Sequence, residues 1–228
     1  MARKRGRIKD KWKLKTWLTV HAPRALGSVP IASIPSNSPE SAIGRVVETT
    51  LFDIFKEDPS NYSIKLYFKI VKVDGNDAYT IFKGHEYARE YLRNLIRRGS
   101  SMVDYINNYI TRDGYKIRIF VVAFTRNRIN SSRKHAIRMA VHKILSERVP
   151  KLTYDQFIHE ILVGDLKKFM LKEAKKVCPI RHLGIRKTKL LEVPKGVEQV
   201  KPVVTKEEEA ELPKEEAAEE ETGTIPAQ

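Results

Sequence analysis

Two segments of the chain alternate apolar and polar residues, and each is interrupted by an Asp-Gly pair. In the first, apolar side chains recur at every second position over Tyr62–Ile70, Asp74-Gly75 follows, and a second apolar segment spans Ala78–Phe82. A period of two is typical of half-buried strands, and Asp-Gly favours the tight turn of a hairpin. A slip in the alternation at residues 71–73 predicts a bulge. An amphipathic helix is predicted next, over Glu86–Arg98.

The same order of elements recurs about 39 residues later. A strand is predicted over Val103–Arg112, a turn at Asp113-Gly114 and a returning strand over Tyr115–Ala123. A helix follows over Ser132–Arg148, with Ser131 or Ser132 as its N-cap. A duplication of one unit is a hypothesis, because hairpins followed by helices are common in unrelated folds.

The chain is predicted to adopt an α+β fold with a mainly antiparallel sheet. The two hairpins and the outer strands are also compatible with a barrel-like sheet, and the sequence leaves closure open. The other predicted elements are a strand at Arg45–Leu51, a helix from near Tyr154 with a capping box of Thr153 and Gln156, a helix at Leu166–Lys176 recapped by Asp165 after Gly164, and a strand at Ile180–Leu191.

Charge is distributed unevenly along the chain. The net charge of the whole sequence is +15, yet residues 196–228 hold ten Glu and three Lys, so this segment carries −7 and the preceding 195 residues carry +22. A body this basic predicts a polyanionic partner, because binding phosphates releases their counterions. Nucleic acid is favoured over an anionic membrane surface. We therefore predict a basic arm over 1–42, a globular domain over 43–193 and an acidic, disordered tail over 194–228.

The predicted arm is rich in basic residues and prolines. Prolines at 23, 30, 35 and 39 are expected to interrupt regular structure after the basic run. Trp12 and Trp17 lie among the basic residues, where they either stack on unpaired bases or anchor the arm to the body. The basic residues predicted to contact RNA are Arg3, Lys4, Arg5, Arg7, Lys9, Lys11, Lys13 and Lys15, with Trp12 beside them.

The densest cluster of cations outside the arm spans residues 125–134, between a predicted strand and a predicted helix. Free backbone N–H groups at the start of a helix, together with its dipole, attract phosphate. Along the helix, cationic and imidazole side chains four residues apart share one face, which is either an RNA-binding surface or simply solvated. The candidate RNA contacts here are Arg126, Asn127, Arg128, Arg133, Lys134, Arg138 and His142.

No catalytic motif is recognisable. The single cysteine, Cys178, excludes an intrachain disulfide and fits a reducing compartment. Asp104, Asp113 and Asp155 are conceivable as ligands of a nuclease metal, but a turn explains Asp113 and the first turn of a helix explains Asp155. We expect no enzymatic activity, no cofactor and no metal. No apolar stretch reaches the roughly 18–20 residues of a membrane-spanning helix.

Several segments resemble one protein family. They are Trp17–Gly27 (WLTVHAPRALG), Gly44–Ile54 (GRVVETTLFDI), Tyr67–Gly84 with the FKGH run at residues 82–85, Thr111–Tyr115 (TRDGY) with the following residues to Lys134, and residues 178–189. Over roughly residues 10–193 the chain is similar to the S3Ae ribosomal proteins of archaea and eukaryotes. The RNA contacts that the resemblance implies are Arg112, Arg126, Arg128, Arg133, Lys134, Arg186 and Lys187. Arg181 and Lys189 are added for their charge on the last strand.

The resemblance implies a structural protein of the small ribosomal subunit in the cytoplasm. Its members lie on the platform near the messenger RNA exit, against ribosomal RNA and neighbouring ribosomal proteins. We accordingly expect ribosomal RNA, neighbouring small-subunit proteins and messenger RNA near the exit as partners, with no membrane and no homo-oligomer. The alternative is a free RNA-binding regulatory protein that acts away from the ribosome.

Overall fold

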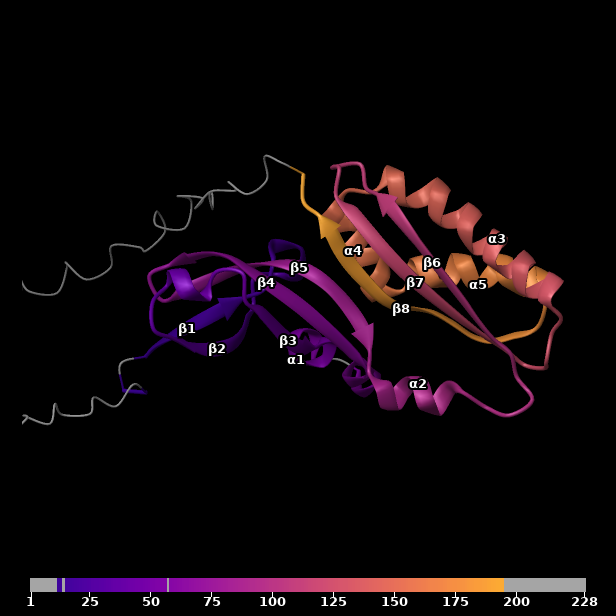
Figure 1. The fold of residues 1–228 in the computed structure, drawn as a ribbon, viewed down its shortest axis with the longest axis horizontal. Coiled ribbons are helices and arrows are strands. Elements are labelled where there is room, and N and C mark those ends of the chain that lie inside the picture. The colour runs from indigo at the N-terminus through magenta and orange to yellow at the C-terminus, as the bar shows by residue number, and fades with distance from the viewer. Residues whose placement is uncertain (1–11, 14, 57, 195–228) are drawn as a thin grey trace, which may run out of the picture. The chain divides into compact units, whose positions relative to one another are not determined.

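The computed structural model describes residues 12–13, 15–56 and 58–194. Figure 1 shows its strands and helices. The strands are β1 (Thr16–His21), β2 (Pro30–Ser36), β3 (Val46–Thr50), β4 (Ile64–Asp74), β5 (Asp77–Tyr87), β6 (Met102–Ile110), β7 (Lys116–Thr125) and β8 (Ile180–Glu192). The α-helices are α1 (Leu51–Phe55), α2 (Arg89–Leu95), α3 (Ser131–Arg148), α4 (Tyr154–Val163) and α5 (Asp165–Val177).

The strands form one sheet in the order β2-β1-β5-β8-β7-β6, with β4 and β3 added beside β5. Only the β1–β5 pair is parallel among these strands, so the prediction of a mainly antiparallel α+β fold is confirmed. The barrel-like alternative is wrong, because β2 and β6 end the sheet without pairing to each other. The sheet branches at β5, because two strands pair with different parts of it. β1 pairs with residues 77–79 of β5, and β8 pairs with Glu86 of β5.

Residues 16–42 differ from the predicted arm, since they contribute β1 and β2 to the sheet. Leu18 and Val20 alternate with the half-buried Thr19 and His21, and both are buried with Ile70 and Ala78 of the hairpin. Strand β2 contains Pro30 and Pro35. Both are tolerated because β2 pairs only with β1, and an edge strand can lack some N–H donors. The basic run at residues 1–11 and the acidic tail from residue 195 lie outside the described residues.

Both Asp-Gly hairpins are present, and β4 has a register shift between Ile70 and Lys72, as the slipped alternation predicts. The helix predicted over residues 86–98 is shorter, because β5 continues through Tyr87 and α2 begins at Arg89. Glu86 pairs with Lys187 of β8, so sheet formation overrides the local helical pattern there.

Helices α3, α4 and α5 lie along one side of β6, β7 and β8 (Figure 1). The ring of Tyr154 in α4 stacks on Tyr115 with their centroids 4.3 Å apart, which joins the helices to the sheet. The capping box of Thr153 and Gln156 is confirmed. The other two predicted caps are wrong: Asn130 is the N-cap of α3, and Gly164 rather than Asp165 is the N-cap of α5.

Strand β6 is one end of the sheet, and side chains engage its backbone. The Arg138 guanidinium of α3 donates from Nε to the Asp104 carbonyl at 3.0 Å. Four residues along, the Asn108 N–H donates to the Asn107 side chain at 2.8 Å. Two backbone groups of this edge strand are therefore satisfied within the protein.

A buried histidine holds β5 against β8. His85 Nε2 lies 3.1 Å from the Ile185 carbonyl and Nδ1 lies 2.8 Å from Thr188 Oγ1. A carbonyl only accepts, so Nε2 carries the proton and Nδ1 accepts from the Thr188 hydroxyl. Burial lowers the pKa of His85 from 6.5 to about 4, while the bond to Ile185 and the charge of Glu86 oppose that shift.

Acid is expected to destabilise the fold through His85. Between pH 6.5 and pH 4 the unfolded chain binds a proton at this residue that the folded chain excludes, so stability falls as pH falls. The full effect is roughly 3 kcal/mol. We expect His85→Gln to be less stable than wild type at pH 7, yet to lose less stability between pH 7 and pH 4 in urea titrations. Equal losses in both proteins would exclude His85 as the source.

Candidate nucleic-acid interface

A cationic cleft of about 630 Å³ lies where β7 ends and β8 begins. Its wall combines the α2–β6 connection, the residue after β7, the last turn of α5 and the start of β8. Apolar atoms are supplied by Pro179 and Ile180. The basic side chains that line the cleft are Arg97, Arg98, Arg126, Lys175 and Arg181.

Hydrogen bonds between distant parts of the chain position this cleft. The buried Thr125 hydroxyl accepts from the Ser101 N–H at 3.0 Å and donates to the Asn127 carbonyl at 2.6 Å. The Arg126 N–H donates to the Pro179 carbonyl at 3.0 Å, which ties the end of β7 to the start of β8. Arg181 Nη2 donates to the Leu95 carbonyl at the end of α2. The cations therefore converge from a rigid frame.

The charges in the cleft are not neutralised internally. Among the ion pairs of residues 12–13, 15–56 and 58–194, none involves any of the five cations that line it. Like charges held together repel, and the repulsion is relieved when an anion binds between them. Guanidinium groups also offer paired N–H donors that match phosphate oxygens. The arrangement is suited to binding a phosphodiester backbone.

A second basic surface is the sheet face opposite α3–α5, which we call the open face. One row of paired positions crosses five strands here: Lys65 of β4 pairs with Glu86 of β5, Glu86 with Lys187 of β8, Lys187 with Phe120 of β7, and Phe120 with Ile106 of β6. Because paired residues project to the same side, these side chains share one face.

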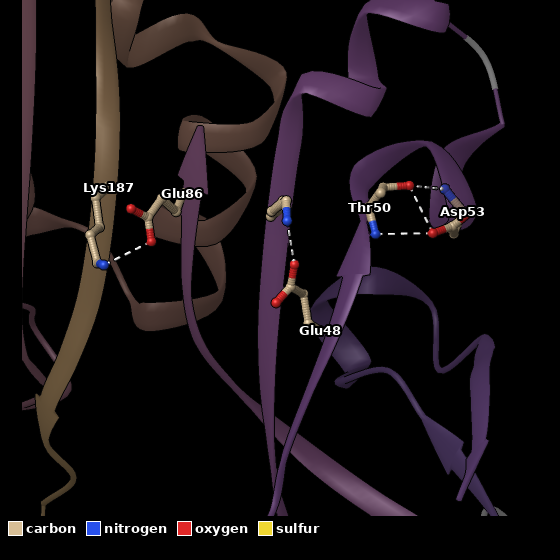
Figure 2. Close-up of polar contacts among 6 residues, drawn as sticks. Glu48, Thr50, Asp53, Glu86 and Lys187 are labelled. Atoms are coloured by element: carbon tan, nitrogen blue, oxygen red, sulfur yellow. Dashed lines mark hydrogen bonds and ion pairs between the residues drawn. The ribbon is translucent and has the colours of Figure 1, made fainter. Parts of the chain in front are cut away.

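Ion pairs organise one half of that row. Lys187 reaches across to Glu86 at 2.8 Å (Figure 2). The Lys65 ammonium lies 2.7 Å from Glu48. At the end of β3, Thr50 and Asp53 form the capping box that begins α1, so their side chains are engaged in structure (Figure 2). The acidic and basic groups over β3, β4 and β5 therefore largely compensate each other.

The other half of the open face holds a smaller pocket of about 380 Å³. Phe120 and Ile106 form its apolar floor, and Asp104 and Glu86 lie among its lining residues. Its cations are Arg118, Arg186, Lys187 and Lys189. Burial raises the pKa of Asp104, and the nearby positive charges of Arg186 and Arg138 oppose that rise. Neither Arg186 nor Lys189 takes part in an ion pair within the described residues.

The structure brings some of the predicted RNA contacts together and separates others. Arg126 and Arg181 meet in the cleft, and Arg186, Lys187 and Lys189 meet on the open face. Arg112 lies in the turn at the opposite end of the β6–β7 hairpin from Arg126. Outside the described residues are Arg3, Lys4, Arg5, Arg7, Lys9 and Lys11.

The remaining predicted contacts are spread around the fold. Trp12 packs edge-on against Trp17, and the Lys15 ammonium lies 4.1 Å from the Trp12 ring. Arg128 is exposed between β7 and α3, and the first turns of α3 carry Arg133 and Lys134. The exposed Lys13 and Asn127 complete the set.

One predicted face of α3 has a structural role. His142 Nδ1 lies 2.7 Å from the Tyr105 hydroxyl and 3.2 Å from the Tyr109 hydroxyl, both on β6. Arg138 contacts the β6 backbone. Both side chains thus help dock α3 on the sheet, and their contact with RNA stays a prediction.

Sequence reasoning missed Arg97, Arg98 and Lys175 in the cleft and Arg118 and Phe120 on the open face. The first three lie at the ends of helical patterns, and only the fold brings those ends together. Phe120 did leave a signal: it occupies the polar phase of an alternating strand, beside Lys116 and Arg118. An aromatic residue at one of the polar positions of a strand projects to the solvent side, where it can contact a ligand.

The carboxylates considered above as nuclease metal ligands do not come together in the described part of the chain. No three His, Cys, Asp or Glu side chains among the described residues are grouped so as to hold a metal ion. Asp113 accepts from the Tyr154 N–H at 2.7 Å and so begins α4. None of the helices in the described part of the chain has the length and apolar character needed to cross a bilayer.

Comparison with known proteins gives a consistent match. The chain is 44% identical over 193 residues to the small ribosomal subunit protein eS1 of Staphylothermus marinus, covering 85% of this chain and 91% of that protein. It is 44% identical to the protein of the same name from Desulfurococcus amylolyticus, covering 88% and 93%, and 40% identical to that from Methanopyrus kandleri, covering 83% and 92%. The profile of the Ribosomal S3Ae family matches residues 3–194. The resemblance seen in the sequence is therefore confirmed: the chain belongs to the Ribosomal S3Ae family.

Proposed function

We propose that this chain is a structural component of the small ribosomal subunit that binds ribosomal RNA through its cationic cleft and open face. Membership of the Ribosomal S3Ae family makes it a ribosomal protein and not an enzyme, and its place of work is then the ribosome in the cytoplasm. The more specific proposal is a position on the platform near the messenger RNA exit, with neighbouring ribosomal proteins and messenger RNA as partners.

The observation that carries this proposal is the cleft. Its five cations come from separate parts of the chain, have no ion-pair partner among the described residues, and converge on a fixed backbone frame. A flexible basic tail would bind RNA as well, but a preformed cleft selects a backbone of matching shape. Shape fit and charge neutralisation are what a protein needs to hold a folded RNA junction.

Sedimentation of a cell lysate tests the proposal directly. We expect the protein to travel with small subunits at about one copy each, and to remain after a high-salt wash that removes loosely bound factors. Protein found chiefly at the top of the gradient would contradict a ribosomal role and favour the free regulatory RNA-binding protein. Release by the wash would contradict a structural role while leaving RNA binding intact.

A further inference from the structure

We propose that the open face binds one unpaired ribonucleotide, with its base stacked on Phe120 and its phosphates held by Arg186 and Lys189. This inference rests on the proposed RNA-binding function and assigns to one part of that surface a ligand of different structure, single-stranded RNA. The cleft where β7 ends and β8 begins contains no aromatic side chain among its lining residues and is suited to phosphates alone.

The first support is the position of Phe120. Helices cover the other side of β6–β8, whereas this half-buried ring stays on the open face between Ile106 and Lys187. Ile106 leaves 56% of its surface exposed. Exposing this apolar surface to water is unfavourable in free energy, and a stacked base would cover it. Sheets that present an aromatic ring among cations bind unpaired bases in this way.

The second support is the size and chemistry of the pocket. Its volume of about 380 Å³ falls in the range of roughly 300–1,000 Å³ that holds small ligands. Asp104 and Glu86 line it, and a carboxylate accepts hydrogen bonds from the amino groups of cytosine, adenine or guanine but repels a phosphate. The base is therefore expected near the acids and the phosphates near Arg186 and Lys189. Uracil, which lacks an amino group, is expected to bind most weakly.

The same features disfavour other partners. An acidic peptide would place carboxylates against Asp104 and Glu86, and would leave the Phe120 ring without a planar partner. An RNA duplex keeps its bases stacked within the helix and offers none to the ring. Single-stranded RNA is the polyanion that satisfies the ring, the acids and the cations together.

The test compares Phe120→Leu with Phe120→Tyr in the full chain. Leucine keeps an apolar side chain but removes the stacking surface, and tyrosine keeps it. We expect Phe120→Leu to bind single-stranded RNA about fivefold to thirtyfold more weakly, with the salt dependence unchanged, and Phe120→Tyr to bind as wild type. Phe169→Leu is the matched control, because Phe169 is an exposed phenylalanine on α5, and it is expected to leave this affinity unaltered.

Ultraviolet cross-linking of the wild-type protein to a single-stranded oligonucleotide gives a second measurement that needs no variant. A cross-link located at Phe120 itself, within the tryptic peptide of residues 119–126, supports the proposal, whereas one at Arg126 of the same peptide would report the cleft. No cross-link there, or equal affinity of folded Phe120→Leu and wild type, overturns it. If wild-type protein still binds RNA and sediments with small subunits, this inference alone fails. If it does neither, the proposed function fails with it.

Discussion

Gly84→Ala is expected to destabilise the fold by at least about 4 kcal/mol, enough to prevent accumulation of folded protein. A Cβ at this position would lie 2.1 Å from the Thr188 carbonyl oxygen and 2.9 Å from its carbonyl carbon, both backbone atoms of β8. Neither can move without separating β5 from β8, and His85 bonds to that same threonine. Chemical denaturation, or the yield of soluble protein where the variant does not fold, measures the effect.

Gly75→Ala is the matched control for this experiment. Gly75 also has a positive φ, +58°, but an added Cβ would meet nothing within 4 Å. We expect a loss of about 1 kcal/mol from backbone strain alone. If the two variants lose similar stability, the close approach of β5 to β8 is not what requires glycine at position 84.

Reversing two charges in the cleft is expected to weaken binding to a folded RNA hairpin about 100-fold at 0.1 M salt, equivalent to about 2.7 kcal/mol. The variant is Arg98→Glu combined with Arg126→Glu, at two exposed side chains from different parts of the wall. Each change removes a proposed phosphate contact and adds a carboxylate that repels the RNA backbone. The corresponding double alanine variant should lower the slope of log affinity against log salt by about two. Filter binding over a salt series measures both quantities.

Lys56→Glu combined with Lys151→Glu changes the net charge by the same amount at exposed positions that lie outside the cleft and outside the strands of the open face. We expect at most a few-fold loss of affinity in this control, from weaker long-range attraction. Equal losses in the two double variants would mean that total charge, and not the cleft, determines binding. Circular dichroism of all variants should match wild type.

Local patterns in the sequence predicted much of the secondary structure, because hairpins and capping boxes depend on neighbouring residues. The Asp74-Gly75 turn and the Thr153–Gln156 box are examples. Long-range pairing explains the failures. β1 is a strand because Leu18 and Val20 are buried beneath the hairpin, and Glu86 leaves its predicted helix because β8 lies alongside. No local pattern contains those partners.

The candidate interface was predictable only in part for the same reason. Basic runs indicated Arg126 and the cations at residues 186–189, since clustering along the chain is visible in sequence. Arg98 and Lys175 are 77 residues apart and meet only after α2 and α5 have taken their places. The sequence shows the charge of each residue, but only the fold shows which residues lie next to it in space.

The side chains that bind the backbone at the edge of β6 are expected to help keep the protein soluble before it is assembled with RNA. A ribosomal protein is made apart from its RNA and must remain soluble until the two meet. An exposed strand edge invites a second copy to add its own strand, and such additions can propagate into aggregates. Because Arg138 and Asn107 already occupy the Asp104 carbonyl and the Asn108 N–H, a newly made chain presents a poor template at this edge.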